Sequence, residues 1–139
     1  IVEELSPQAT EHQVDVTLKI LSSLRIMADP KKFAEIAENL VSNGIKYNKQ
    51  AGKLCITGEE DARYITLIFK DTGLGIPKSE QGEVFSKFYR SSKPEVRQKP
   101  GTGLGLFVVR MLTQKMRGKI SFESIDGIGT TFYLSFLKA

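Results

Sequence analysis

The sequence predicts an α/β fold, a two-layer sandwich in which a mixed, mostly antiparallel sheet is covered on one face by about three helices. Three observations favour this class. Two pairs of segments alternate apolar and polar residues around short turns, as half-buried strands do. Two other segments have helical periodicity, and strands and helices follow one another along the chain. The length of 139 residues and the hydrophobic content of 40% suit one globular domain with a buried core.

The first 28 residues are predicted to form a short helix and two strands. Residues 1–13 are typical of a short helix or of the end of a longer one. Residues 14–21 (VDVTLKIL) alternate apolar and polar side chains and include β-branched residues, which predicts a strand. Residues 24–28 (LRIMA) are interpreted as a second short strand.

A long helix is predicted to begin after Asp29 and to extend to about Lys46. Asp29 is a good N-cap residue, and Pro30 suits the first helical position because the N–H that it lacks has no partner there. The apolar residues of this helix recur at helical spacing and form one stripe that faces the core. They are Phe33, Ile36, Ala37, Leu40, Val41 and Gly44.

Two β-hairpins are predicted in the rest of the chain. The first joins residues 52–60 to residues 62–71 through a turn near Glu60–Asp61. The second joins residues 119–126 to residues 129–137, and the Asp-Gly pair between them favours a tight turn. Both pairs supply the antiparallel part of the predicted sheet.

A long segment, residues 71–103, separates the two hairpins and is rich in Gly, Pro, Ser, Lys and Arg. Within it, only residues 82–90 (GEVFSKFYR) are predicted to be helical. A weakly structured segment of this length inside a compact domain is usually functional or mobile. Helical periodicity resumes over residues 103–116, and Gly118 is the predicted C-cap of that helix.

Three polar residues of the long helix, Asn39, Asn43 and Lys46, fall within an arc of about 60° beside its apolar stripe. Their side chains are therefore expected at the rim of the core. Amide oxygens suit Mg²⁺, which prefers hard oxygen ligands and shares them with substrate phosphates, and a lysine could contact those phosphates. The alternative, three solvated polar residues, is equally compatible with this helix alone.

The motif FKDTGLGIP places Asp71 at the end of an apolar strand, followed by Gly73 and Gly75. A half-buried carboxylate there can accept a hydrogen bond from an exocyclic amine such as that of adenine. Glycines let the backbone approach a flat ligand closely. An ordinary turn is the alternative interpretation of Asp-x-Gly-x-Gly.

A second glycine cluster, Gly101, Gly103 and Gly105, leads directly into the second helix, where backbone N–H groups could bind phosphate. Its spacing differs from the dinucleotide-binding motif, and the chain contains no GxxxxGK[ST] phosphate-binding loop. Phosphate binding by this cluster would therefore follow another arrangement.

The loop between the glycine clusters is basic, which predicts a mobile lid over an anionic ligand or, alternatively, a merely solvated loop. Arg90 is singled out because the aromatic Tyr89 precedes it, and Phe85 and Phe88 could anchor the loop to the body. The basic residues are Lys87, Arg90, Lys93, Arg97 and Lys99.

Composition excludes several classes of protein. A net charge of +4 permits an anionic ligand, but a nucleic-acid interface would need a denser basic stripe. The single cysteine, Cys55, cannot form an internal disulfide, suits a reducing compartment and is expected to be buried. No apolar run has the length of a membrane span, and the polar N-terminus is unlike a signal peptide.

Taken in order, ENLVSNGIKYN, DTGLGIP, VFSKFYR and GTGLGL resemble the N, G1, F and G2 boxes of the catalytic domain of sensor histidine kinases. That domain belongs to the GHKL superfamily, which includes gyrase, Hsp90 and MutL. The resemblance extends from about Asp29 to the C-terminus, about four fifths of the chain. It implies a Bergerat-type sandwich with ATP between the long helix and a flexible ATP lid.

The resemblance also implies roles for single residues. Asn43 matches the Mg²⁺-binding asparagine, and Asn39 matches its supporting polar ligand. Lys46 is similar to the phosphate-contacting lysine, and Tyr47 to the aromatic residue that packs on adenine. Asp71 would bind the adenine amine.

In the lid, Arg90 is similar to the arginine near the γ-phosphate, so the implied catalytic residues are Asn43, Lys46 and Arg90. The two glycine clusters would shape the adenine pocket and the phosphate-side hinge of the lid. The implied nucleotide contacts are completed by Gly73, Gly75, Ile76, Gly101, Thr102, Gly103, Leu104, Gly105 and Leu106.

One substitution favours a kinase over an ATPase. Hydrolysing relatives carry a glutamate that activates water at the position of Asn39, and an amide cannot take that proton. The implied reaction is transfer of the γ-phosphoryl group of Mg·ATP to a histidine. A GHKL-type ATPase and a nucleotide-holding regulatory module remain the alternatives. His12 lacks the sequence context of a phosphoacceptor.

The resemblance also implies that the ATP site and the phosphoacceptor histidine lie in separate domains. Residues 1–12 would link an absent dimerisation and phosphoacceptor domain to the catalytic ATP-binding domain, residues 13–139. The implied partners are that dimerisation domain of the same protein and, indirectly, a response regulator receiver domain, with no nucleic acid. The full-length protein would be a homodimer, and this domain would be cytoplasmic with or without a membrane anchor elsewhere.

Overall fold

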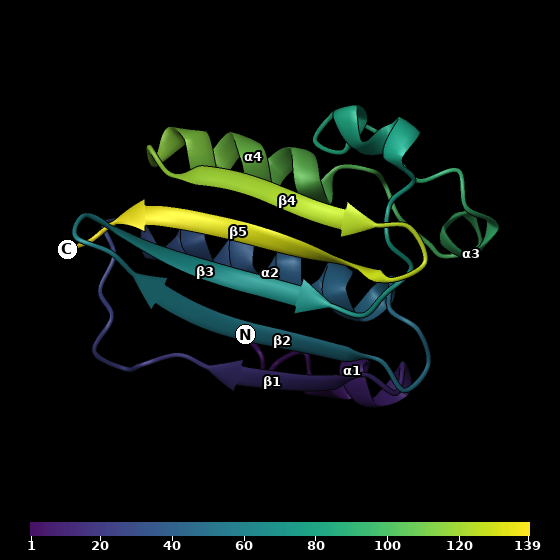
Figure 1. Cartoon of the computed structure of the whole chain (residues 1–139), viewed down its shortest axis with the longest axis horizontal. Coiled ribbons are helices and arrows are strands. Elements are labelled where there is room, and N and C mark those ends of the chain that lie inside the picture. The colour runs from purple at the N-terminus through teal and green to yellow at the C-terminus, as the bar shows by residue number, and fades with distance from the viewer.

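A computed structural model describes all 139 residues, and it confirms the predicted fold class. The five strands form one sheet in the order β1-β2-β3-β5-β4, in which only the β1–β2 pair is parallel (Figure 1). The elements in chain order are α1 (Ser6–Glu11), β1 (Asp15–Lys19), α2 (Pro30–Lys46), β2 (Lys53–Glu60), β3 (Tyr64–Asp71), the 3₁₀ helix η1 (Lys78–Glu83), α3 (Pro94–Arg97), α4 (Gly105–Lys115), β4 (Lys119–Ile125) and β5 (Gly129–Leu137).

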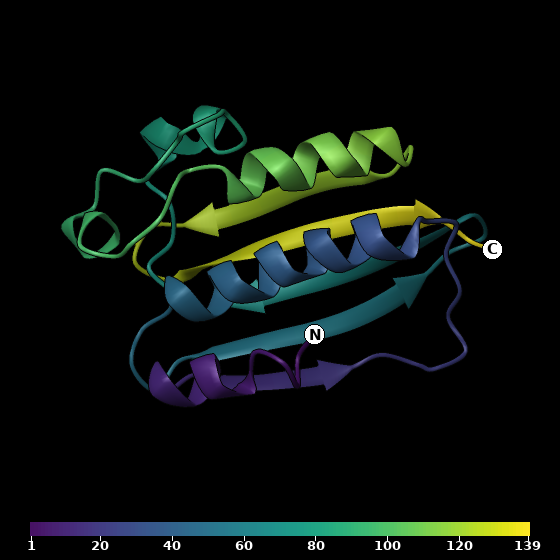
Figure 2. The same ribbon diagram turned by 180° about the vertical axis from the view of Figure 1, so that it is seen from behind.

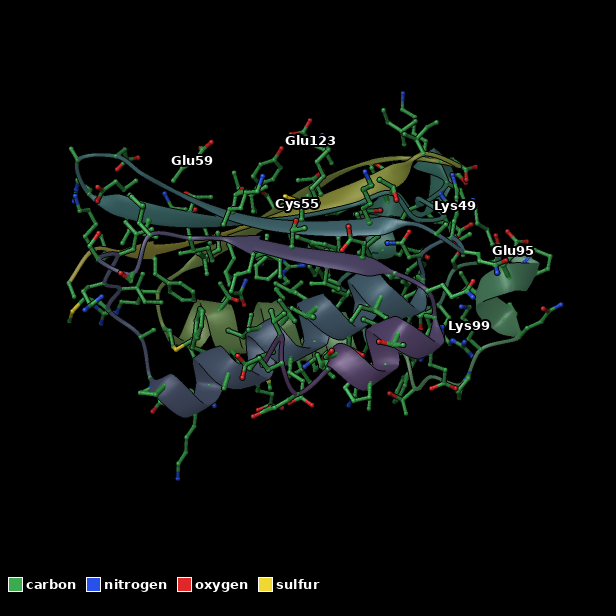
Figure 3. The ribbon with its side chains drawn as sticks, turned by 90° about the horizontal axis from the view of Figure 1, so that it is seen from below. Lys49, Cys55, Glu59, Glu95, Lys99 and Glu123 are labelled. Carbon is green, nitrogen blue, oxygen red and sulfur yellow. The ribbon has the colours of Figure 1, made fainter.

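Helices α1, α2 and α4 cover one face of the sheet, and the other face has no cover (Figure 2). Seen along the sheet, Cys55, Glu59 and Glu123 lie on the side away from the helices (Figure 3). Cys55 is therefore only half-buried, and the prediction of a buried cysteine was wrong. Successive side chains of β2 point to opposite faces of the sheet. Leu54 therefore faces the core, and Cys55, the next residue, faces away from it.

The prediction for α2 is confirmed, because local and tertiary preferences agree there. Asp29 Oδ1 accepts hydrogen bonds from the N–H groups of Lys31 at 2.9 Å and Lys32 at 3.1 Å, which caps the helix. The apolar stripe packs between the sheet and α4, and all of its predicted residues except the partly buried Phe33 are buried. The buried residues of α2 are Ile36, Ala37, Leu40, Val41, Gly44 and Ile45.

Two predictions of secondary structure in the connecting segments were wrong. Residues 24–28 form no strand; Ile26 makes a single bridge to Lys138 before the chain leaves the sheet to begin α2. Residues 82–90 form no α-helix, because the helical turn lies earlier, in η1, and the chain then turns to Phe88. The Phe88 N–H donates to the Gly103 carbonyl instead of to a helical neighbour.

The two lid phenylalanines have different environments. The Phe85 ring packs against Phe122 and Phe132 with centroid distances of 5.7 and 6.4 Å, so it anchors the segment as predicted. Phe88 is 65% exposed and anchors nothing.

The prediction that Gly118 is the C-cap of α4 was also wrong. The N–H groups of Arg117 and Gly118 donate to the carbonyls of Gln114 and Thr113, a Schellman pattern in which Arg117 takes the positive φ of 57°. Gly118 is needed for another reason, since a Cβ there would lie 2.6 Å from the Phe136 ring.

The first residues of the chain are packed onto the domain. Helix α1 lies against β1, and both Ala9 and Val14 belong to the main hydrophobic core. Whether residues 1–12 also serve as a linker stays a prediction. No helix combines the length and the apolar character needed to cross a membrane.

Candidate functional site

A cavity of about 350 Å³ opens where the C-terminal half of α2, the end of β3 and the start of α4 meet the segment 77–104, here called the lid. Most residues predicted for the site line it. They are Asn39, Asn43, Lys46, Tyr47, Asp71, Gly75, Ile76, Arg90, Gly101, Thr102, Gly103, Gly105 and Leu106. Only Gly73 and Leu104 of the predicted set are absent from its walls.

Helix α2 supplies one polar wall. The Asn39 side-chain N–H donates to the Glu35 carbonyl at 2.9 Å, which leaves Oδ1 free to accept or to bind a cation. Asn43 lines the cavity one turn further along. The Lys46 ammonium lies 5.1 Å from the centroid of the Tyr47 ring, a distance that allows a cation–π contact. Asn39, Asn43 and Lys46 therefore line the same cavity.

Asp71 lies at the end of β3 and gives the opposite wall its carboxylate. Its Oδ1 accepts hydrogen bonds from the N–H groups of Gly73 at 2.8 Å and Thr130 at 3.1 Å. Burial raises the pKa of Asp71 to about 6, and those two N–H groups oppose the rise. Because both donors use the same oxygen, Oδ2 remains available to a ligand that donates a hydrogen bond.

Gly75 shapes this wall, since the chain after Asp71 runs directly against the end of β4. Its φ is +69°, and a Cβ would lie 2.1 Å from the Ile125 carbonyl oxygen. Gly73 lies outside the cavity, in the turn after β3. The N–H of the next residue, Leu74, donates to the Tyr47 carbonyl and joins this turn to the end of α2. Gly73 therefore supports the site without lining it.

The lid supplies a second cation. Nη2 of Arg90 donates to the carbonyls of Val96, at 2.7 Å, and Lys99, while its buried Nε has no partner in the protein. Gly101 brings the lid against α2, because the position of a Cβ there is 3.1 Å from Lys46 Nζ and 3.5 Å from Arg90 Nε. The two cations therefore border one end of the cavity.

Several lining residues were not predicted from the sequence: Ser42, Leu74, Val84, Tyr89, Ser91, Val96, Thr130 and Phe132. Thr130 holds Asp71 from a strand 59 residues away, and no local pattern indicates that contact. Tyr89 donates to Glu80 at 3.1 Å, and burial together with that carboxylate raises the pKa of Tyr89 to about 12. In the sequence, the only sign that Tyr89 would line the cavity was its position directly before Arg90.

The arrangement suits an elongated ligand with one anionic end. Lys46 and Arg90 can neutralise phosphates, and Asp71 can accept a hydrogen bond from a base at the other end. Asp71 is the only carboxylate among the lining residues, and the protein has no cluster of three His, Cys, Asp or Glu side chains that could bind a metal by itself. Any Mg²⁺ would need the oxygens of Asn39, Asn43 and the ligand's own phosphates.

The sandwich and this cavity define the class as a nucleotide-binding α/β domain. Residues 28–139 match the family model described as "Histidine kinase-, DNA gyrase B-, and HSP90-like ATPase", and the chain belongs to that family. Nucleotide binding follows from the membership, and the predicted class is confirmed.

Sensor histidine kinases are among the similar proteins of known sequence. Sensor histidine kinase WalK of Bacillus subtilis is 38% identical over 112 residues, which are 78% of this chain and 18% of WalK. Sensor protein SrrB of Staphylococcus aureus is 36% identical over 110 residues, 79% of this chain and 19% of SrrB. The chain thus spans about a fifth of the length of these relatives.

Solved structures of histidine kinases share the fold. The mycobacterial sensor histidine kinase MprB has a TM-score of 0.84 at 22% identity, with 99% of this chain and 93% of that chain covered. Full-length ShkA in complex with AMPPNP has a TM-score of 0.84 at 26% identity, with 99% and 29% covered. Histidine kinase ThkA in complex with response regulator protein TrrA has a TM-score of 0.77 at 22% identity, with 99% and 38% covered.

Proposed function

We propose that this domain binds Mg·ATP and transfers the γ-phosphoryl group to a histidine of a separate dimerisation domain, as the catalytic part of a two-component sensor kinase. The observation that carries this proposal is the composition of the cavity, with a single carboxylate at one end and two cations beside paired amides at the other. The relatives WalK and SrrB, named as a sensor histidine kinase and a sensor protein, support the same assignment.

At the base end, Asp71 would accept the hydrogen bond of the adenine amine through Oδ2, and Tyr47 would contact the ring. The carboxylate is already oriented by Gly73 and Thr130, so little rearrangement is needed on binding. A site built for a donor discriminates strongly against bases that lack one. Gly75 and Ile76 would complete the walls around the base.

At the phosphate end, Lys46 and Arg90 would orient the phosphates and neutralise the charge that develops in transfer. Asn39 and Asn43 would hold Mg²⁺, which supplies further neutralisation of that charge when bound. The N-terminus of α4, with Gly101, Thr102, Gly103, Leu104, Gly105 and Leu106, would offer backbone N–H groups to the phosphates.

The kinase is favoured over an ATPase because the phosphate end has no general base. Asn39 cannot accept a proton from water, and Asp71 belongs to the base end. Glu38 is exposed and absent from the cavity. Bound ATP would therefore be hydrolysed slowly and would react with a nucleophile supplied by another domain. A hydrolysing ATPase and a nucleotide-holding regulatory module are the outcomes to be distinguished by experiment.

The partners of the whole protein belong to the same proposal. The phosphoacceptor would lie in a dimerisation domain joined through residues 1–12, the full-length protein would be a homodimer, and this domain would face the cytoplasm. A response regulator receiver domain would accept the phosphoryl group next. The structural neighbour ThkA, solved together with TrrA, supports this last step.

The test follows the phosphoryl group. The domain is mixed with Mg²⁺, ATP labelled in its γ-phosphate and the dimerisation domain of the full-length protein. We expect acid-labile, base-stable label on the dimerisation domain. In Asn43→Ala the transfer rate should fall by roughly 100-fold, because the phosphates lose their positioning. Lys78→Gln, outside the cavity, is the control.

Rapid release of free phosphate without labelled protein would instead identify an ATPase. Near-normal transfer by Asn43→Ala would remove the assignment of the phosphate end. Bound nucleotide with neither transfer nor release would favour the regulatory module.

A further inference from the structure

The lid contacts the body of the domain on both sides of the cavity. At the phosphate end, Lys99 Nζ donates to the carbonyl of Lys46, in the last turn of α2. At the base end, Gln81 of the lid donates to the carbonyls of Ile76 and Ser124, and a further contact is made by Lys93, which is the N-cap residue of the short lid helix α3. The position of Lys93 therefore determines where Val96 of α3 lies, and Val96 lines the cavity.

Lys93 has two partners outside the lid. Its ammonium donates to the Leu74 carbonyl at 2.6 Å and forms an ion pair with Asp126, in the turn between β4 and β5. The Lys93 side chain is only 18% exposed, whereas that of Asp126 is 53% exposed. A charge so largely removed from water needs both partners.

Three segments meet at the Leu74 carbonyl. It accepts from Lys93 of the lid and from the Gly127 N–H of the β4–β5 turn, at 2.8 Å. Leu74 itself lines the cavity three residues after Asp71. The contact thus joins the lid directly to the part of the wall that carries the base-binding carboxylate.

Other lid cations do not make this connection. The Lys78 side chain makes no hydrogen bond or ion pair, and that of Lys87 lies over the rings of Phe88 and Phe107. Arg97 and Arg90 bond only to lid carbonyls. Among these cations, Lys93 alone ties the lid to the base end of the cavity.

We infer that Lys93, through Asp126 and the Leu74 carbonyl, is a latch that holds the lid closed and so sets the rate at which nucleotide enters and leaves. The inference rests on the proposed function for its ligand, but the closed lid is a property of the protein alone. Lys93 does not line the cavity, so it is a positioning residue that acts through the lid.

A latch and an affinity contact predict different kinetics. If Lys93 restrains the lid in both the free and the bound domain, its loss should raise the association and dissociation rates together and leave the Kd within about twofold. If Lys93 instead stabilised only the bound state, dissociation alone would accelerate and the Kd would rise in proportion.

The experiment uses the 139-residue chain, Mg²⁺ and a fluorescent ADP labelled on its ribose, with both rates measured by stopped flow. We expect Lys93→Gln to raise both rates about fivefold, which corresponds to about 1 kcal/mol for a partly exposed ion pair. Asp126→Asn should raise them about twofold, and the double variant should be no faster than Lys93→Gln, since both changes break one contact. Lys93→Arg should restore slow exchange, and Lys78→Gln, which removes the same charge from the lid, should match the wild type.

Hydrogen exchange of the α3 amides in the nucleotide-free protein tests the latch without any ligand. Lys93→Gln should exchange these amides about fivefold faster than Lys78→Gln, while the amides of the central strand β3 stay unchanged. Equal exchange in the two variants would overturn the latch.

The two proposals fail differently. If the wild-type chain does not bind the labelled ADP, the proposed function fails, and the exchange experiment still decides the latch. If ADP binds and Lys93→Gln has wild-type rates, or a raised Kd with unchanged association, the latch is wrong and the nucleotide site remains.

Discussion

The wall of the cavity that carries Asp71 and the lid that covers it are held in place by different interactions. At the base end, the Asp71 carboxylate accepts from the backbone N–H groups of Gly73, in the turn after β3, and Thr130, in the paired strand β5. At the lid, long cationic side chains such as Lys93 and Lys99 bond to carbonyl oxygens of the body. The two donors that hold Asp71 are backbone groups anchored at paired strands, so they move little unless the sheet opens, whereas the long side chains of the lid can lose their contacts one at a time. The proposed base site is therefore preformed, and it lies beside a segment whose contacts with the body can break one at a time.

The largest expected effect that separates the two ends is at Asp71. In Asp71→Asn, one oxygen can still accept from Gly73 and Thr130, but the group offered to adenine becomes a donor. We expect the Kd for ATP to rise about 100-fold, the cost of leaving buried polar groups unpaired. Titration calorimetry would measure it, with Glu59→Gln on the uncovered face of the sheet as the control.

Equal affinity of the two variants would mean that Asp71 does not bind the base. The wall that carries Asp71 would then lack the role given to it, and its comparison with the lid would lose its functional meaning.

Two glycines test how rigid each region is. Gly75→Ala should lower the free energy of unfolding by about 2 kcal/mol, because the residue has φ +69° and a Cβ would meet the Ile125 carbonyl oxygen. Gly82→Ala, in η1 of the lid, has nothing within 4 Å and should change stability by less than about 1 kcal/mol. Denaturant unfolding monitored by circular dichroism would compare the two. Similar losses in both variants would show the lid to be as constrained as the base end.

The smallest expected effect is a pH dependence confined to the base end. Burial raises the pKa of Asp71 to about 6, so the folded chain binds this proton more tightly than the unfolded chain does. The contribution of Asp71 to the free energy of unfolding therefore falls as pH rises from about 4 to about 6. Binding of the adenine amine needs the ionised form, so affinity should fall as pH drops below 6.

At pH 5 the affinity for adenosine, which has no phosphates to titrate, should be about tenfold weaker than at pH 7.5. Calorimetric titrations at the two pH values would measure the change. Asp71→Asn should bind weakly at both, and a persistent pH dependence in that variant would assign it to another group.

The sequence alone predicted the elements whose local signals agree with their packing. Asp29 and Pro30 mark the start of α2, and its apolar stripe marks the face that became the core. The alternating strands predicted the sheet, and the polar residues of α2 predicted one wall of the cavity. These succeed because capping, periodicity and burial act over a few neighbouring residues.

The lid was predicted less well, since its conformation depends on distant partners. Residues 82–90 look helical, yet Phe88 pairs with Gly103 and Phe85 packs on β4 and β5. Arg117, not Gly118, takes the positive φ at the end of α4, and Gly118 is needed instead because a Cβ there would collide with Phe136.

What the sequence determined by itself is the type of each main element and the chemistry of the polar residues on α2 and after β3. Only the tertiary structure decided that Thr130 would hold the Asp71 carboxylate and that Lys93 would reach both Leu74 and Asp126. The physical reason is distance along the chain. Local preferences fix a residue's neighbours within a few positions, whereas partners tens of residues apart meet only once the sheet has formed.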